Sequence, residues 1–308
     1  MIGLADAVDR DPSLPDPTAP LTASGNLGRR GVVSRVVAVG ASAAALFAVV
    51  LLAAVVYTVV SKGAPAFSLD FLFTNPTGLA SGGIFNALIG TVVIVGFGAL
   101  IAVPVAVLTA LYLTEFADPR SRLARALKLV LDLLQGLPTI IIGVVVFGLI
   151  VETTRLETGF AGSVALAIVM LPLIARSSQE VLRLVPGSLR EAADALGVDH
   201  WRAVLGVILP AAIGGIATGA ILSIARAAGE TAPLLFVDSL YNPNLTQLDI
   251  FGHGVPSIPI YIWTNYDLPS TSALTRVWGA ALVLLLFILL ANVGARVLLA
   301  RSRAKMRR

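Results

Sequence analysis

The sequence has no cysteine, so neither a disulfide framework nor a metal site with thiolate ligands can form. It has only two histidines, His200 and His253, and a histidine-based metal site is not expected. No G-x-x-x-x-G-K-[ST] segment occurs, so the sequence offers no nucleotide-phosphate loop of that type. Charged residues make up 13% of the 308, against about a quarter in ordinary soluble domains. With no nucleic-acid-binding module either, these absences argue against a soluble metalloenzyme and a nucleic-acid-binding protein.

Apolar residues make up 57% of the chain and lie in long runs rather than in short alternating patches. Runs of about 20 apolar residues are long enough to cross the hydrocarbon core of a bilayer. The runs are Val32–Val60, Phe85–Leu113, Leu127–Val151, Ala161–Ile174, Val204–Ala225 and Val277–Leu299. We therefore predict an all-α integral membrane protein with six transmembrane helices.

The chain ends differ from these runs in composition. Residues 1–30 are rich in Pro, Asp, Ser and Gly without an apolar period, which predicts a disordered tail. This segment is too polar to be the apolar region of a signal peptide, so the first run is interpreted as a retained span. Residues 31–300 then form the transmembrane domain, and residues 301–308 form a short basic tail.

Lysine and arginine are distributed unevenly between the two ends of the predicted spans. Cytoplasmic segments of membrane proteins carry an excess of both residues. If the N-terminus is cytoplasmic, all but four of the 22 Lys and Arg residues fall on that side, the exceptions being Lys62, Arg155, Arg226 and Arg276. This distribution predicts that both termini are cytoplasmic.

The segment at about residues 237–275 lies outside the cytoplasm in this topology. Its aromatic residues are Tyr241, Tyr261, Trp263 and Tyr266. Such residues form an interfacial belt in many membrane proteins. They could equally form a contact surface for an extracytoplasmic partner, and the sequence leaves both interpretations open.

Residues 188–200 read as a short helix between the fourth and fifth spans. Ser188 is a candidate N-cap, with Glu191 three residues later completing a capping box. Gly197 is a candidate terminator, and Asp199 can cap the following helix. The helix has one face of small and apolar residues, namely Leu189, Ala192, Ala193 and Leu196. Such a helix could pack on its own bundle or dock into a groove of another protein.

Two Arg/Glu pairs lie in or near the predicted spans, where charged side chains are costly. Arg176 precedes Glu180 by one helical turn, and Arg226 precedes Glu230, which Thr231 follows. At this spacing each pair can partly neutralise itself on one helix face. The pairs are either structural or line a path for an anion, because guanidinium binds phosphate oxygens in a bidentate manner and stays charged.

The predicted 188–200 helix carries a recognisable signature. Glu191-Ala192-Ala193, Gly197 and Leu209-Pro210 resemble the EAA motif of ABC importer permeases, with Val207 in place of the usual isoleucine. The resemblance implies that this helix inserts into a cleft of a separate ATPase subunit and transmits its closure to the spans. ATP and magnesium would then be bound by that subunit, and this chain would need no cofactor.

A second resemblance concerns the substrate. Residues 225–236 are similar to the R-A-x-G-E-T-A-P-L-L-F segment of PstA-type phosphate permeases, and Tyr112–Ala117 and Pro138–Ile140 resemble further segments of this family. It implies a type I ABC importer permease in the bacterial plasma membrane. The implied partners are a PstC-like permease, two copies of a PstB-like ATPase and a PstS-like phosphate-binding protein, in addition to membrane lipid.

Three rival interpretations remain. Permeases for sulfate, molybdate or phosphonate carry the same EAA loop. An ion-coupled secondary transporter could also use intramembrane Arg/Glu pairs, and it would work without an ATPase. An intramembrane enzyme is disfavoured, because the sequence shows neither a metal-ligand cluster nor a nucleophile–base set.

Overall fold

The computed structural model describes residues 27–78, 81–238 and 249–306, and these are mostly helical. The chain divides into two compact units, residues 1–57 and 58–308. Of the predicted tail at residues 1–30, residues 1–26 lie outside the described residues, and residues 27–30 belong to a helix. The described part of the first unit belongs to helix α1 (Leu27–Gly63), whose apolar side chains are exposed all round the helix. A helix of this kind is stable in hydrocarbon, where its backbone polar groups are satisfied internally.

Five helices of the described residues are long and apolar enough to cross a membrane, which confirms the predicted class of protein. They are Arg29–Ala66, Phe85–Phe116, Gly159–Arg183, His200–Ala227 and Thr271–Val297. The count reaches six if one bent helix pair is a single span.

That bent pair corrects the predicted third span, Leu127–Val151, which is not one continuous helix. Helix α4 (Arg122–Gly136) and the segment from Thr139 to Thr154 meet at an angle of 107°. Leu137 between them is extended, with ψ of 136°, because the residue before a proline avoids the helical region. The second segment comprises α5 (Thr139–Val146), the π-helical turn η3 (Phe147–Val151) and α6 (Glu152–Thr154).

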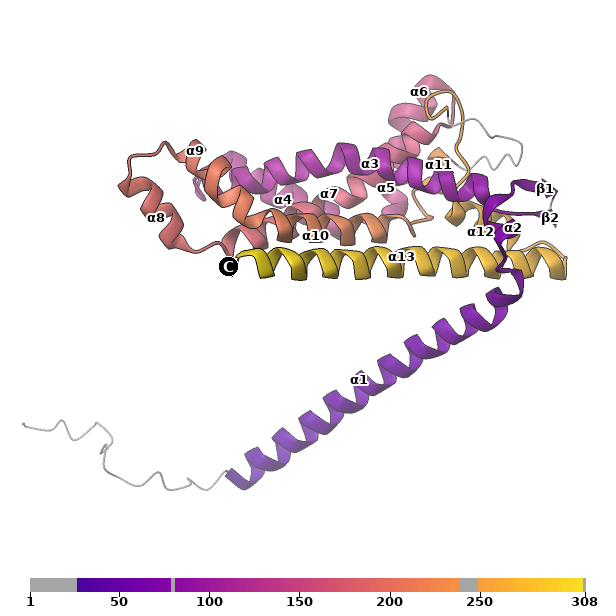
Figure 1. The fold of residues 1–308 in the computed structure, drawn as a ribbon, viewed down its shortest axis with the longest axis horizontal. Helices are drawn as coiled ribbons and strands as arrows, with labels where there is room; N and C mark the ends of the chain where they lie inside the picture. Colours follow the sequence, from indigo (N-terminus) through magenta and orange to yellow (C-terminus); the bar gives the residue numbers. More distant parts are fainter. Residues whose placement is uncertain (1–26, 79–80, 239–248, 307–308) are drawn as a thin grey trace, which may run out of the picture. The chain divides into compact units, whose positions relative to one another are not determined.

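The second unit is a bundle centred on α7 (Gly159–Arg183). Helix α7 packs against α3 (Phe85–Leu111) and α10 (Leu209–Ala227), and α10 packs in turn against α13 (Thr271–Met306) (Figure 1). Glycines allow the close approach: a Cβ on Gly98 would lie 2.9 Å from the Ser163 carbonyl oxygen, and one on Gly215 would lie 2.5 Å from Val181. Small residues at helix interfaces are typical of membrane bundles. Residues 301–306, expected as part of a basic tail, continue α13.

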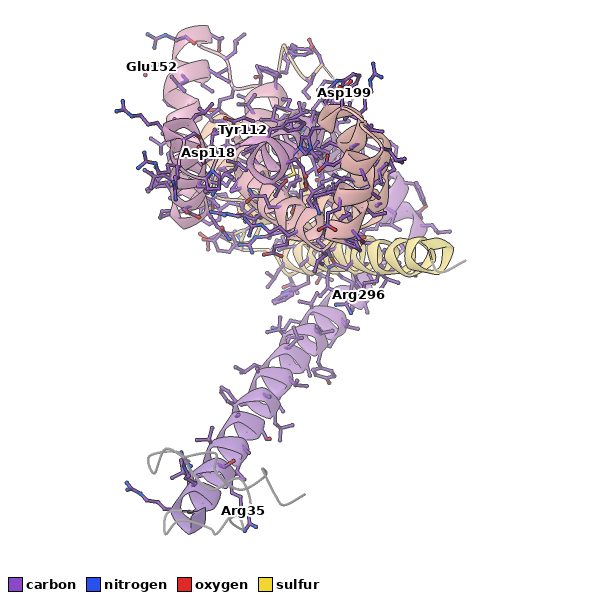
Figure 2. All side chains as sticks on the ribbon, turned by 90° about the vertical axis from the view of Figure 1, so that its left-hand side faces the viewer. Arg35, Tyr112, Asp118, Glu152, Asp199 and Arg296 are labelled. Carbon is purple, nitrogen blue, oxygen red and sulfur yellow. The ribbon has the colours of Figure 1, made fainter. Side chains whose placement is uncertain are left out.

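The bundle carries different elements at its two ends (Figure 1). At one end lie α8 (Gly187–Ala195), α9 (His200–Ala203) and the end of α13. Figure 2 looks onto this end. The opposite end carries short elements: the 3-10 turn η1 (Ala64–Ala66), α2 (Leu69–Phe73), the antiparallel pair β1 (Pro76–Gly78) and β2 (Ser81–Gly82), α11 (Leu234–Val237) and α12 (Ile258–Asn265).

Candidate functional site: a projecting helix and two charged helix contacts

Helix α8 is the predicted helix of the EAA segment, and its observed start differs from the prediction. Its N-cap is Pro186, which makes no side-chain cap hydrogen bond, and Ser188 lies inside the helix. The predicted capping box is therefore wrong, because Pro186 with its fixed φ already starts the helix two residues earlier. The predicted end is confirmed. Gly197 has φ of +69°, and the N–H of Val198 donates to the Ala193 carbonyl at 3.1 Å.

Most of α8 is exposed. Of the four residues predicted to form one face, Ala193 alone is buried, and Leu196 is 82% exposed. Glu191 and Ala192 are exposed as well. The apolar residues that project around α8 include Leu184, Leu196 and Trp201. Clustered exposed apolar side chains beside charged ones are typical of a protein interaction surface.

Asp199 occupies the N-cap position of α9 as predicted, but its side chain makes no cap hydrogen bond. Its carboxylate lies 3.4 Å from Nε of Arg202 instead. Between α9 and α10 the chain forms a π-helical turn, η4 (Val204–Ile208), and Leu209 and Pro210 then begin α10. The EAA segment is thus a projecting helix joined to a long apolar helix through a widened turn. Such π turns occur often at functional sites.

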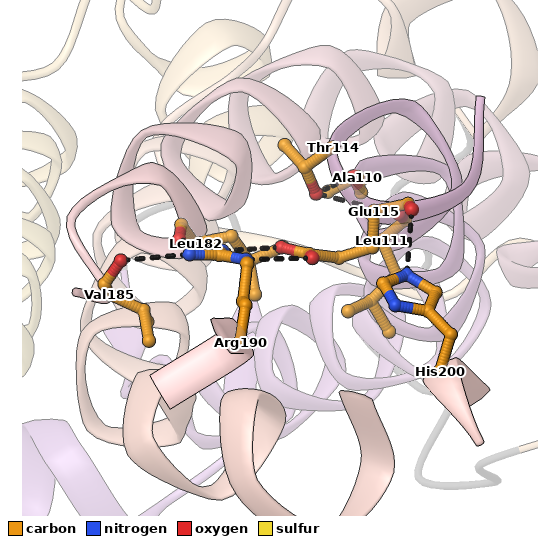
Figure 3. Close-up of polar contacts among 8 residues, drawn as sticks. All are labelled: Ala110, Leu111, Thr114, Glu115, Leu182, Val185, Arg190 and His200. Carbon is orange, nitrogen blue, oxygen red and sulfur yellow. Dashed lines mark hydrogen bonds and ion pairs between the residues drawn. The ribbon is translucent and has the colours of Figure 1, made fainter. Parts of the chain in front are cut away.

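Arg190 fixes the base of α8 to the bundle (Figure 3). Its Nη2 donates to Oε1 of Glu115 at 2.7 Å, and its Nε donates to Oε2 at 3.1 Å. The same guanidinium donates to the carbonyls of Val185 at 2.9 Å and Leu182 at 3.2 Å. These hydrogen bonds to Glu115 raise the pKa of Arg190 above its ordinary value. One guanidinium therefore joins α8, the end of α7 and the π-helical turn η2 (Tyr112–Phe116) that follows α3.

Glu115 makes a second contact, to the first residue of α9, which follows α8 in the chain. Its backbone carbonyl lies 2.9 Å from Nε2 of His200, and the His200 ring packs edge-on against Phe116 at a centroid distance of 5.2 Å. The side chain of Glu115 is only 2% exposed. Sequence reasoning missed this pair. The available signal was an acidic residue at the end of an apolar run, where an ionised group needs a partner.

The first predicted intramembrane pair is wrong in its partner. Arg176 pairs with Asp132 of α4 rather than with Glu180. Helix α4 packs against α7, so a carboxylate distant in sequence reaches the arginine. Glu180 is exposed one turn further along α7.

The second predicted pair is confirmed, with an open geometry. Nε of Arg226 lies 3.9 Å from Oε1 of Glu230, and the two side chains are 68% and 19% exposed. The hydroxyl of Thr139, the first residue of α5, donates to Oε2 of Glu230 at 3.4 Å. Thr231 lies in the turn that leads to α11, where its carbonyl accepts the N–H groups of Leu234 and Leu235.

Both predicted arginines thus lie close to the break between α4 and α5. Asp132 precedes the break and contacts Arg176, and Thr139 follows it and contacts the partner of Arg226. Gly143 of α5 packs closely against Pro233. A Cβ on Gly143 would lie 2.7 Å from the Pro233 carbonyl oxygen. Among the described residues, no group of three or more His, Asp or Glu side chains is arranged to hold a metal ion.

Residues 102–307 match the protein family described as binding-protein-dependent transport system inner membrane component. The phosphate transport system permease protein PstA 1 of Mycobacterium tuberculosis is 40% identical over 70% of this chain and 70% of its own. The corresponding PstA of Haemophilus influenzae is 38% identical over 79% and 85%, and that of Xylella fastidiosa is 35% identical over 92% and 98%. The chain belongs to the PstA family of transport permeases.

A solved structure agrees with this assignment. A chain of the MetNI methionine ABC transporter in inward-facing conformations matches this PstA-family chain with a TM-score of 0.55 and 21% identity. The match covers 71% of this chain and 94% of that chain. At this identity it shows the fold alone, which is the predicted ABC importer permease fold.

Proposed function

We propose that this PstA-family chain is a permease subunit of an ATP-driven importer of inorganic phosphate. The names of its relatives support phosphate as the substrate. The observation that carries the proposal is α8, a helix with the EAA sequence that projects from the bundle and buries only Ala193. A helix that is fixed at its base and exposed elsewhere is suited to enter a groove in another protein.

Coupling would follow from this placement. Residues Glu191, Ala192, Ala193 and Gly197 belong to the docking helix, and Leu209-Pro210 begin the long helix that receives its motion. The ATPase that binds α8 supplies ATP hydrolysis, and its closure moves α8 relative to the membrane. We expect this end of the bundle to face the cytoplasm of a bacterial cell, with both chain termini on that side and the chain in the plasma membrane.

Arg226 supports a path for an anion. It lies in the last turn of an apolar helix and is mostly exposed, although an exposed charge next to lipid is unfavourable. We therefore expect its guanidinium to face a cavity shared with a second, PstC-like permease. Its loose pairing with Glu230 allows an exchange in which a phosphate oxygen briefly replaces the carboxylate. Arg176, which pairs with the exposed Asp132, could act in the same way.

The complete importer would contain this chain, the PstC-like permease, two PstB-like ATPase subunits and a PstS-like binding protein on the outer face. Affinity purification of this chain from its native membrane tests the proposal. We expect the second permease and the ATPase to copurify, with ATP hydrolysis stimulated by phosphate.

A substitution in α8 sharpens the same experiment. Glu191→Ala should weaken association with the ATPase, whereas Glu152→Ala is the matched control, since Glu152 is exposed on α6, away from α8 (Figures 1 and 2). Recovery of this chain alone, fully active under an ion gradient, would contradict the proposal and favour a secondary transporter.

A related oxyanion is the second candidate substrate, because guanidinium binds sulfate and phosphonate oxygens as well as those of phosphate. Uptake of labelled phosphate in the presence of excess sulfate, molybdate or phosphonate separates these substrates. We expect competition by unlabelled phosphate alone. Strong inhibition by another oxyanion would reassign the cargo and leave the docking of α8 unchanged.

A further inference from the structure

We propose that Glu115 is a positioning residue that ties the docking helix α8 to the translocation bundle, and that phosphate transport depends on this tie. The inference rests on the proposed function of the chain. Glu115 is far from α8 in sequence, 75 residues before Arg190, yet it contacts both flanks of the helix. Its carboxylate binds Arg190 at the start of α8, and its carbonyl binds His200 after the end of α8.

The hydrogen-bond geometry makes the contact between Glu115 and Arg190 rigid. Two N–H groups of Arg190 meet the two oxygens of one carboxylate, and a bidentate pair of this kind restricts rotation as well as separation. The remaining donors of the guanidinium reach the carbonyls of Leu182 and Val185, so the arginine is held from several directions. A displacement of α8 is thereby passed to η2 and to the end of α7 at the same time.

Few other contacts hold α8 to the bundle. Within α8, Ala193 is the one buried residue, and its methyl group is small. The helix also packs against α9 and η4, which follow it in the chain, and the short segment from Leu184 to Pro186 joins it to α7. Without the Glu115 contact, α8 would keep the hydrogen bond from Arg190 to Leu182 of α7 but lose its direct connection to η2, and we expect η2 and α3 to follow its motion less closely.

The position of Glu115 connects the tie to the path. It lies in η2, directly after α3, and α3 packs along α7, which carries Arg176. α7 also packs against α10, which carries Arg226. Arg176 is therefore in the helix whose end contacts Arg190, and Arg226 is in a helix that packs against that one.

The test uses the complete importer, purified and reconstituted in phospholipid vesicles, with this chain carrying Glu115→Gln. Glutamine keeps the shape and one acceptor but loses the charge. Losing one charge-assisted hydrogen bond is worth about 1.5 kcal/mol, or roughly tenfold in an equilibrium between engaged and disengaged states. We expect the complex to assemble and the phosphate carried per ATP hydrolysed to fall several-fold. Glu115→Asp, which keeps the charge, should restore part of that ratio, and Glu152→Gln is the control.

The outcomes separate this inference from the proposed function. If the unmodified complex shows no phosphate-stimulated hydrolysis, the proposed function fails. If the unmodified complex is active and Glu115→Gln carries as much phosphate per ATP as it does, the positioning role is wrong. Loss of assembly in both the Gln and the Asp variants would also overturn it, because Glu115 would then be a purely structural residue.

Discussion

The Arg190–Glu115 pair and the Arg226–Glu230 pair combine the same two side-chain types and differ in geometry and burial. The first is bidentate, its shorter contact is 2.7 Å, and its carboxylate is almost completely buried. The second has a separation of 3.9 Å, and its arginine is mostly exposed. A pair of the first kind holds two elements together, because the buried carboxylate is shielded from water and from other cations. A pair of the second kind can open for an incoming anion at small cost.

In the proposed function, this difference would let one chain couple ATP hydrolysis to transport and also conduct an anion. The Arg190–Glu115 pair must stay intact while α8 moves, because its loss would uncouple α8 from the bundle. If Arg176 and Arg226 bind the anion as proposed, they must also release it, because tight binding would trap it. Arg176 resembles the second kind, because its partner Asp132 is exposed.

Breaking the Arg190–Glu115 pair should have the largest effect, a loss of stability. Arg190→Ala leaves the Glu115 carboxylate buried without its partner, and breaking such a pair costs roughly 3–5 kcal/mol. We expect a clear fall in the melting temperature of the purified complex, measured by differential scanning fluorimetry. Arg183→Ala is the control, because Arg183 is exposed at the end of the adjacent helix α7. Equal melting temperatures for the two variants would show that the Arg190–Glu115 pair contributes little to stability.

Opening the second pair should affect transport more than stability. Arg226→Gln removes a guanidinium that can make charge-assisted hydrogen bonds to phosphate, each worth about 1.5–3 kcal/mol. We expect phosphate uptake to fall about tenfold or more with assembly intact. Arg125→Gln removes an exposed arginine of α4 and serves as the control. Loss of assembly with Arg226→Gln would assign that pair a structural role and remove the contrast between the two pairs.

Local features of this fold could be predicted from the sequence. Long apolar runs predict spanning helices because lipid requires them, and the glycine at position 197 predicts the end of α8 because left-handed backbone favours glycine. The run Leu127–Val151 was interpreted as one span interrupted by Pro138, and the bend of 107° between α4 and α5 was not predicted. Its signal was present in Leu137-Pro138, where the residue before proline is forced out of the helix.

The contacts of the charged residues could not be predicted in the same way. A spacing of four residues suggested that Arg176 binds Glu180, but the observed partner is 44 residues distant, and the partner of Arg190 is 75 residues distant. Such pairs depend on how helices pack, which a spacing rule does not contain. The Arg226–Glu230 pair was predicted correctly because it lies within one segment of the chain.

A milder change at α8 tests whether its exact end matters to docking. Gly197→Ala places a side chain at φ of +69°, a conformation that costs about 1 kcal/mol for a residue with a Cβ. Gly187→Ala is a closely matched control, because neither added methyl group would meet a neighbour within 4 Å. We expect Gly197→Ala to weaken ATPase association several-fold in a pull-down titration, and Gly187→Ala to leave it unchanged. Equal behaviour of the two variants would show that docking tolerates a distorted helix end.

The smallest effect is expected at Asp238, a buried carboxylate that has no basic partner among the described residues. It lies after α11, outside the five long helices, and its Oδ1 accepts the N–H of Val255 at 2.7 Å. Burial raises the pKa of Asp238 well above its ordinary value, the Val255 hydrogen bond lowers it, and the nearby Glu157 raises it again. Glu115 is balanced by a cation, whereas burial of Asp238 favours its protonated form.

The sign of the resulting pH dependence follows from this shift. The folded chain holds the Asp238 proton more tightly than the unfolded chain, so the protonated group's contribution to stability is complete below the ordinary aspartate pKa and is lost as pH rises through the raised value. Asp238→Asn mimics the protonated form, so the variant should melt close to the unmodified protein at acidic pH and above it at alkaline pH. The difference between the two melting curves cancels every contribution that the two proteins share. If the two melting temperatures differed by the same amount at every pH, the charge state of Asp238 would not change over that range. Asp238 would then not differ from Glu115 in its protonation.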